Sequence, residues 1–411
     1  MATNKKRKKA SPQPQIGGYK HFMKDLREAL AMVPIVDNLS DFSNEEKRFM
    51  YGHNLEIRNP VAGNEYITSK ELKFFSEKAK KYYREKSVNA GDKFYSIYQL
   101  QLVCVYAEVR ATNLVKTSGN KMHPEAVKYR ELSKKLIRIF FERFLIYYYS
   151  LFTKLSNPDQ KYYGVKILPA LNNESKVKIV FEISGFPAQK RMMKINGYNR
   201  PAFQLGKAIE SETKPFHWIS VDVLSLGNFY TGNKQKLDVF IQSRALSRLS
   251  ERLDLLDREA INYVLWENTN TALQFGTYKG YLLLPFKVFE VKIGYLVANV
   301  IDEKLLFRTF LFITHNSTPE GDRLRQLTGL SKEDITYWHI DRLSTFVNLN
   351  EEQYPELIRL FSKAGLGGLR QLKDKEFNID SMQAANLNGL TEYINRGKQE
   401  RMIPDQNCIP F

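Results

Sequence analysis

The sequence predicts an α+β protein, in which an N-terminal helical domain is followed by a mixed, largely antiparallel β-sheet domain with packed helices. Apolar side chains recur at helical spacing through residues 19–156, and from residue 157 onward they alternate or become β-branched. Helix signals then return: Pro319 is placed to begin a short helix and Gly329 to end it. These three observations together favour α+β over an all-helical or all-β fold.

The chain of 411 residues is long enough for two or three domains with sizeable cores. We predict, in order, a disordered basic tail at 1–18, a helical domain at 19–156, a β-rich segment at 157–235, an α+β unit at 236–346 and a helical segment at 347–411. The tail is suited to nonspecific phosphate contact or to a nuclear address, with a solvated tail as the alternative. Its cations are Lys5, Lys6, Arg7, Lys8 and Lys9.

Three helices are expected in the helical domain. The first begins near Ser69, a favourable N-cap residue, and the second covers residues 92–116. The third starts at His123 and continues to Lys154, with aromatic side chains on nearly every side. A helix that is apolar all round is typical of a buried core helix, so we favour packing over bases stacking on exposed rings.

Strands separated by turn residues are expected next. Residues 162–168 and 176–183 predict one hairpin, and residues 191–195 and 202–205 predict a second around Asn196 and Gly197. A further strand is expected at 217–226.

A stripe of arginines follows the short apolar strand at 237–241. Ser243 is placed to begin a helix in which Arg244, Arg248 and Arg252 recur every four residues and therefore share one face. Leucines occupy the opposite side, which predicts packing on a sheet. Arginines on one face are suited to binding phosphates, and the alternative is a solvated face with pairs such as Arg248 with Glu251 or Asp254 with Arg258. The leucines are Leu246, Leu249, Leu253 and Leu256.

The segment with the most chemical potential is the strand pair at 293–300 and 305–314. Its second strand carries Arg308 and ends at Thr314, His315 and Ser317, just before the helix that Pro319 begins. A cation, hydroxyls and an imidazole beside a helix N-terminus favour phosphate chemistry, because histidine exchanges protons near neutral pH.

The order of strand, arginine-bearing helix and three strands resembles the RelE-like toxins and the wider barnase–colicin-type ribonucleases. The resemblance covers about 80 residues, 236–318, and is carried by VFIQSRALSRLSERL, YLLLPFKV, IGYLVANVI and LLFRTFLFIT. It implies metal-independent RNA cleavage in which the 2′-hydroxyl attacks the phosphate. The implied roles are phosphate stabilisation by Arg308, acid or base action by His315, orientation of RNA by Arg244 and Arg248, and hydrogen bonds from Thr314 and Ser317.

Strand alternation has a consequence for that catalytic pair. Along an ideal strand, Arg308 shares a face with Thr314, whereas His315 lies on the other face, unless a twist or bulge intervenes. The favoured function is therefore a nucleic-acid-binding protein. A RelE-like endoribonuclease is the second prediction, and a structural or assembly protein of a phage or mobile element is the third.

Composition restricts partners and cofactors. The net charge is +17, of which residues 1–160 supply +12, and this asymmetry favours nucleic acid, RNA rather than DNA. The sequence contains no uninterrupted apolar run of about 18 residues, so no membrane span is predicted. Two cysteines, Cys104 and Cys408, allow neither a disulfide framework nor a paired-cysteine metal site, which favours the cytoplasm. The histidines lack metal-ligand spacing, and Asp341 is expected to be a solvated charge, so no metal and no cofactor are predicted.

Overall fold

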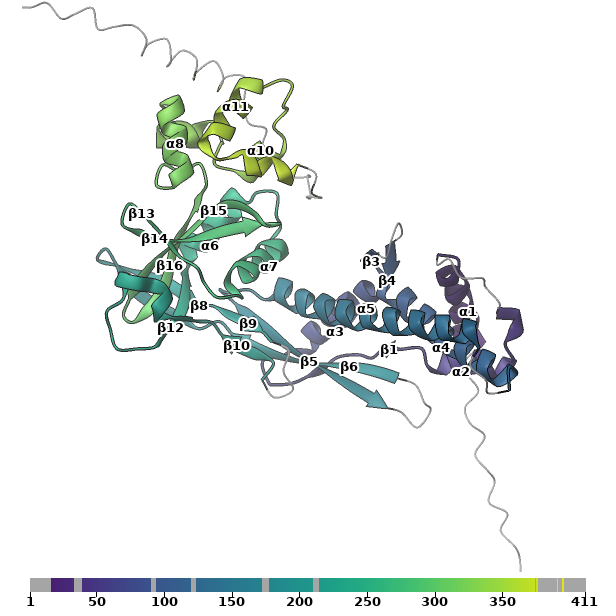
Figure 1. The fold of residues 1–411 in the computed structure, drawn as a ribbon. Helices are drawn as coiled ribbons and strands as arrows, with labels where there is room; N and C mark the ends of the chain where they lie inside the picture. The colour runs from purple at the N-terminus through teal and green to yellow at the C-terminus, as the bar shows by residue number, and fades with distance from the viewer. Residues whose placement is uncertain are drawn as a thin grey trace, which may run out of the picture. The chain divides into compact units, whose positions relative to one another are not determined.

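A computed structural model describes residues 16–32, 39–89, 94–119, 123–171, 177–209 and 214–373, together with 375, 390 and 394. Its fold class is α+β, as predicted, with helices first and a mixed sheet with packed helices after them (Figure 1). The chain groups into two compact units: unit 1 is Met1–Tyr149 with Val165–Ser184, and unit 2 is Ser150–Gly164 with Gly185–Phe411. The β-rich segment expected at 157–235 is thus divided between them. The cations at 5–9 and most of the segment after residue 373 lie outside the described residues.

Unit 1 is mainly helical, and its helices begin where capping chemistry allows. Thr68, rather than Ser69, caps helix α3 (Ser69–Arg84). The Thr68 hydroxyl accepts from the Glu71 amide, and the Glu71 carboxylate accepts from the Thr68 amide. The helix expected at 92–116 begins later, because residues up to Ser96 form a strand and Ser96 caps the helix. The helices are α1 Ile16–Leu30, α2 Asn44–Gly52, α3 Ser69–Arg84, α4 Ile97–Thr117 and α5 Pro124–Leu155, with a 3₁₀ turn, η1, at Leu39–Asp41. The strands are β1 Glu56–Ile57, β2 Val61–Ala62, β3 Lys86–Asn89, β4 Phe94–Ser96, β5 Lys161–Leu171 and β6 Val177–Pro187. The end of α5, the start of β5 and the end of β6 belong to unit 2.

The aromatic side chains of α5 pack in the core, as the sequence indicates. Phe144 and Tyr148 are buried, and the ring centroid of Tyr148 lies 4.4 Å from that of Phe181 on β6. The Tyr148 hydroxyl donates to the Ala79 carbonyl on α3 at 3.0 Å. Among the aromatic side chains of α5 that the structure describes, Phe141 is exposed, at 54%. Among the described helices, none combines the length and apolarity that crossing a bilayer requires.

Unit 2 is built on an eight-stranded sheet with the order β13-β14-β15-β16-β12-β8-β7, and β11 also pairs with β12. The strands are β7 Lys190–Ile195, β8 Tyr198–Gln204, β9 Gly206–Ala208, β10 Phe216–Trp218, β11 Ser220–Asp222, β12 Lys236–Gln242, β13 Gly276–Tyr278, β14 Tyr281–Val288, β15 Val291–Ile301 and β16 Lys304–Phe312. The helices are α6 Ser243–Arg252, α7 Arg258–Thr269, α8 Pro319–Thr328, α9 Lys332–Tyr337, α10 Leu343–Val347 and α11 Pro355–Ala364, with 3₁₀ turns η2 Val223–Phe229 and η3 Gly367–Leu372. The strand expected at 217–226 is thus two short strands and a 3₁₀ turn.

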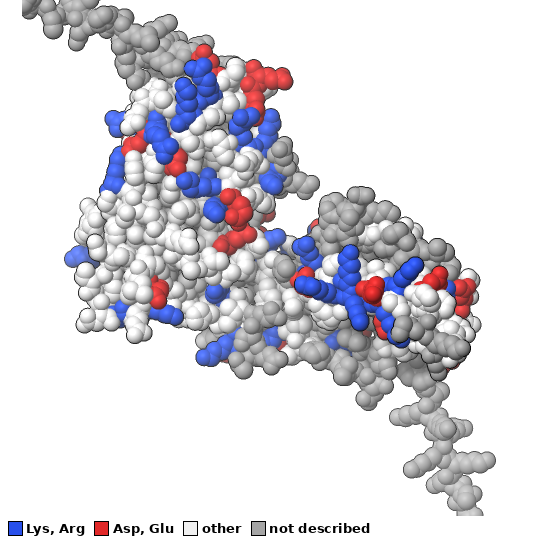
Figure 2. All heavy atoms as spheres, viewed as in Figure 1, with Lys and Arg blue, Asp and Glu red and all other residues white. Residues whose placement is uncertain are grey.

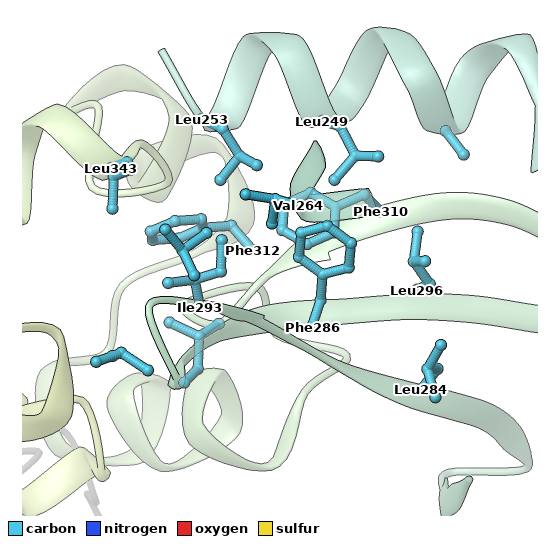
Figure 3. Packing of buried hydrophobic residues seen from close by; sticks show 14 of the residues in the cluster. Leu249, Leu253, Val264, Leu284, Phe286, Ile293, Leu296, Phe310, Phe312 and Leu343 are labelled. Atoms are coloured by element: carbon cyan, nitrogen blue, oxygen red, sulfur yellow. The ribbon is translucent and has the colours of Figure 1, made fainter. Parts of the chain in front are cut away.

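The main core of unit 2 lies between α6, α7 and one face of this sheet. Leu249 of α6 and Leu253, the residue that directly follows this helix, are fully buried and point toward Phe310 and Phe312 of β16, as Figure 3 shows. This confirms that the leucine face of α6 packs on the sheet. Burying each of these leucines stabilises the fold by about 1.5–3 kcal/mol. Because the leucine face is packed in the core, the opposite, arginine-bearing face of α6 is directed outward.

Where it pairs antiparallel with β15, strand β16 contains a bulge at Arg308. Thr309 lies opposite Val297 and Phe307 lies opposite Ala298, so that Arg308 has no residue opposite it. The bulge shifts the alternation: Phe307 faces the main core before it, and Phe310 does so after it. The strand therefore has two segments whose side chains follow different parity.

Candidate functional site

The predicted arginine stripe lines a concave pocket of about 120 Å³ in unit 2. The pocket lies where the parallel strands β12 and β16 both end, a position at which sheets commonly bind ligands. Its walls are the arginine face of α6, residues 309–312 of β16, the turn at His315 and Asn316, and one face of α9. The structure thus brings Arg244, Arg248 and Arg252 together with His315.

The cations of the pocket differ in their partners. Arg248 donates to the Glu251 carboxylate at 2.6 Å, which confirms one intrahelical pair expected from the sequence. The other expected pair is wrong, because Arg258 contacts Asp159 and Asp254 accepts from Ser344. Within the described part of the chain, Arg244 and Lys332 form no ion pair, and both are exposed.

The strand edge adds backbone donors to this wall. Strand β12 pairs with β16 only up to Phe307, so residues 308–312 have no strand neighbour on that side. The Ile313 amide donates to the Ile293 carbonyl at 2.9 Å, and antiparallel pairs alternate in the direction of their hydrogen bonds. The amides of Phe310 and Phe312 are therefore directed away from β15, toward the pocket, while their rings lie in the core.

His315 is neutral at physiological pH. Its Nδ1 accepts from the Ser317 amide at 3.1 Å, so that the proton of the neutral ring lies on Nε2. Burial, together with the positive charges of Lys332, Arg252 and Arg248, lowers the pKa of His315 to about 4. Burial of the imidazole is the larger cause of the low pKa, and the surrounding positive charges add to it.

Three other predicted site residues do not line the pocket. Thr314 is fully buried, and its hydroxyl donates to the Ile340 carbonyl at 2.8 Å. Arg308 is half-buried at the bulge, and Ser317 lies in the turn after β16. The bulge at Arg308 interrupts the ideal strand alternation from which the sequence predicted that Arg308 and His315 lie on opposite faces, and of these two residues His315 lines the pocket.

A buried ion pair closes one end of the pocket. Arg252 contacts the carboxylate of Asp341, which is 6% exposed, so the expectation of a solvated charge at this position is wrong. Burial raises the pKa of Asp341 although Arg252 and Arg342 oppose the shift. Its second oxygen, Oδ1, has no hydrogen-bond partner. This pair fixes the end of α6 against the turn that follows α9.

Gly321 allows the helix α8 to approach the pocket turn. A Cβ at this position would lie 2.0 Å from the carbonyl oxygen of His315, closer than any side chain tolerates. Thr318 caps the same helix, since its hydroxyl accepts from the Gly321 amide and donates to the His315 carbonyl. The backbone of His315 is therefore held by α8.

Basic side chains also gather on unit 1. Figure 2 shows lysine and arginine over α5. The exposed cations of this helix outnumber its acids, and α3 carries a further exposed set. They are Lys128, Arg130, Lys134, Lys135, Arg138 and Arg143 on α5, and Lys70, Lys73, Lys80, Lys81 and Arg84 on α3.

No family model, curated protein or solved structure matches this chain.

The low pKa of His315 predicts a pH-dependent stability. The unfolded histidine has a pKa of about 6.5, so that below this pH the unfolded state binds more protons than the folded state. Neutral His315 makes its full contribution to the free energy of unfolding above a pH of about 6.5. This contribution, at most about 3 kcal/mol, is lost as the pH falls toward 4. Urea unfolding of wild type and His315→Asn, between pH 7 and pH 4, measures it.

The asparagine variant serves as the comparison because its amide oxygen replaces Nδ1 as an acceptor and does not titrate. We expect the free energy of unfolding of His315→Asn to fall less steeply with decreasing pH. Parallel curves for the two proteins would show that His315 titrates normally in the folded state.

Proposed function

We propose that the protein binds nucleic acid, RNA in preference to DNA, through the pocket between α6, β16 and α9. The observation that carries this proposal is the convergence of Arg244, Arg248 and Lys332 in one concavity. Guanidinium groups on one helix face match the geometry of phosphate oxygens, and Lys332 adds a point charge from α9.

Two further features support a phosphate as the occupant. The amides of Phe310 and Phe312 supply neutral donors, which anions at strand edges and turns accept. The neutral His315 keeps an Nε2–H donor in the same pocket at physiological pH. Exposed cations on α3 and α5 of unit 1 add sequence-independent attraction for polyanions.

The test is the salt dependence of binding. Full-length protein is titrated into a labelled single-stranded RNA at several salt concentrations, and the same sequence as DNA is measured in parallel. Each phosphate neutralised on a single strand lowers the slope of log K against log salt by about 0.7, so three pocket cations predict a slope of about −2 or steeper. An affinity that does not change with salt would contradict the proposal.

Ribonuclease activity is the second candidate, supported by one observation: His315 shares the pocket with Arg244 and Arg248. The proposal for cleavage uses these arginines in place of Arg308 to stabilise the reacting phosphate, and the Nε2–H of neutral His315 as a further hydrogen-bond donor to it. The RNA recovered from the titration, performed with EDTA, distinguishes the two candidates. Fragments that His315→Ala abolishes would establish cleavage, and intact RNA would leave binding alone.

A further inference from the structure

The residues that line the pocket carry more positive charge than one backbone phosphate can neutralise. Among them, three arginines and one lysine are offset by a single carboxylate, that of Asp341. Glu251, which accepts from Arg248 at 2.6 Å, offsets one further charge from outside the lining. His315 adds no charge at physiological pH, because its pKa is about 4. The surplus in the pocket is therefore about two positive charges.

Hydrogen-bond donors come from each wall of the pocket. Arg244 and Arg248 lie on the outward face of α6, and Lys332 lies on α9. The turn after β16 supplies the Nε2–H of His315, and the free edge of β16 supplies backbone amides. Donors on several sides suit a group that presents acceptor oxygens in several directions.

The pocket is small and is closed at one end. Its volume of about 120 Å³ lies below the roughly 300–1,000 Å³ of sites that enclose a whole small molecule. At the closed end, the side chains of Arg252 and Asp341 are only 14% and 8% exposed. A phosphate inside a strand is bonded to the chain on two sides, so the chain must enter the pocket and leave it again. A phosphate at the end of a strand is bonded on one side and needs a single opening.

We propose that the pocket binds the terminal phosphate of an RNA strand, at its 5′ or its 3′ end, rather than a phosphate within the strand. This inference rests on the proposed function and adds which phosphate of the RNA the site takes. A phosphomonoester carries a charge of about −1.5 to −2 at pH 7 and presents three acceptor oxygens. A phosphodiester within the strand carries a single negative charge and presents fewer free oxygens. The terminal group therefore matches both the charge surplus and the spread of the donors.

The test measures, by calorimetry, the binding of four single-stranded RNAs to the full-length protein. Three share one sequence and differ in their ends: two hydroxyls, a 5′-phosphate or a 3′-phosphate. The fourth is one nucleotide longer and has hydroxyl ends, so that it contains as many phosphates as the phosphorylated strands. We expect one phosphorylated strand to bind at least about tenfold more tightly than the fourth strand, because one additional charge-assisted hydrogen bond is worth about this factor. The tighter of the two phosphorylated strands identifies the end that the pocket takes.

The control asks whether the preference for a phosphorylated end belongs to the pocket. In Arg244→Ala/Arg248→Ala, this preference should fall below about twofold. In Lys190→Ala/Arg191→Ala, which removes two exposed cations at the start of β7, it should stay as in wild type.

The outcomes separate this inference from the proposed function. If the phosphorylated strands bind no more tightly than the fourth strand, or if the preference survives Arg244→Ala/Arg248→Ala, recognition of a terminal phosphate by the pocket is refuted while phosphate binding stands. A phosphoserine peptide that binds as tightly as the phosphorylated RNA would also overturn it and assign the pocket to a phosphoprotein. If wild type binds none of the four strands, the proposed function fails and this inference fails with it.

Discussion

Replacing Arg244 and Arg248 together by alanine is expected to weaken binding of single-stranded RNA about 100-fold. Each guanidinium supplies charge-assisted hydrogen bonds worth about 1.5 kcal/mol or more, and a loss of about 3 kcal/mol corresponds to this factor. The side chains lie on the pocket face of α6, opposite the buried Leu249, so their removal leaves the core intact. Fluorescence anisotropy with a labelled oligonucleotide at fixed salt measures the change.

A matched control removes two cations elsewhere in unit 2. Lys190 and Arg191 begin strand β7 at the edge of the sheet, and both are exposed. Lys190→Ala/Arg191→Ala lowers the net charge by the same amount, and we expect it to change the affinity less than threefold (about 0.6 kcal/mol or less). Equal losses in the two double variants would mean that total charge, rather than the pocket, determines binding.

Substituting Arg252 by alanine is expected to destabilise the fold by about 3 kcal/mol. The variant leaves the Asp341 carboxylate buried without its cation, and the second oxygen of that carboxylate has no partner to compensate. Denaturant unfolding of the full chain measures the loss. We also expect weaker RNA binding, because the pair fixes the end of α6 that bears Arg248.

The control is another arginine–aspartate pair. Arg258 contacts Asp159 at 3.0 Å, but both side chains are well exposed, so Arg258→Ala should cost less than about 1 kcal/mol. Replacing Arg252 and Asp341 together by leucine removes the buried charge and should restore much of the stability that Arg252→Ala loses. A cost for Arg252→Ala no larger than that for Arg258→Ala would contradict the role assigned to the pair.

Much of the fold and part of the site could be predicted from local patterns. The spacing of Leu249 and Leu253 indicated the buried face of α6, and Pro319 and Gly329 mark the two ends of α8 as expected. The turn at Asn196 and Gly197 joins β7 to β8, because asparagine tolerates the left-handed backbone and glycine, which lacks a Cβ, adopts it without strain. These features depend on residues close in sequence.

The rest of the site depends on tertiary contacts that local patterns do not specify. Lys332 carries no motif, and it enters the pocket because α9 packs beside the end of β16. Asp341 reads as an ordinary surface acid until the fold places Arg252 against it. No glycine or proline near Arg308 signals the bulge in the sequence. The hydroxyl of Thr314 suggested a site residue, but this side chain is buried and donates to a backbone carbonyl instead.

The salt slope of RNA binding by wild type and by Arg244→Ala/Arg248→Ala tests the central claim most directly. If these arginines neutralise phosphates in the pocket, the plot of log K against log salt should become shallower by about 1.4, twice the single-strand value of about 0.7 per phosphate. The Lys190→Ala/Arg191→Ala control should keep the wild-type slope. An unchanged slope in the α6 variant would show that the arginine pocket does not bind the nucleic-acid backbone.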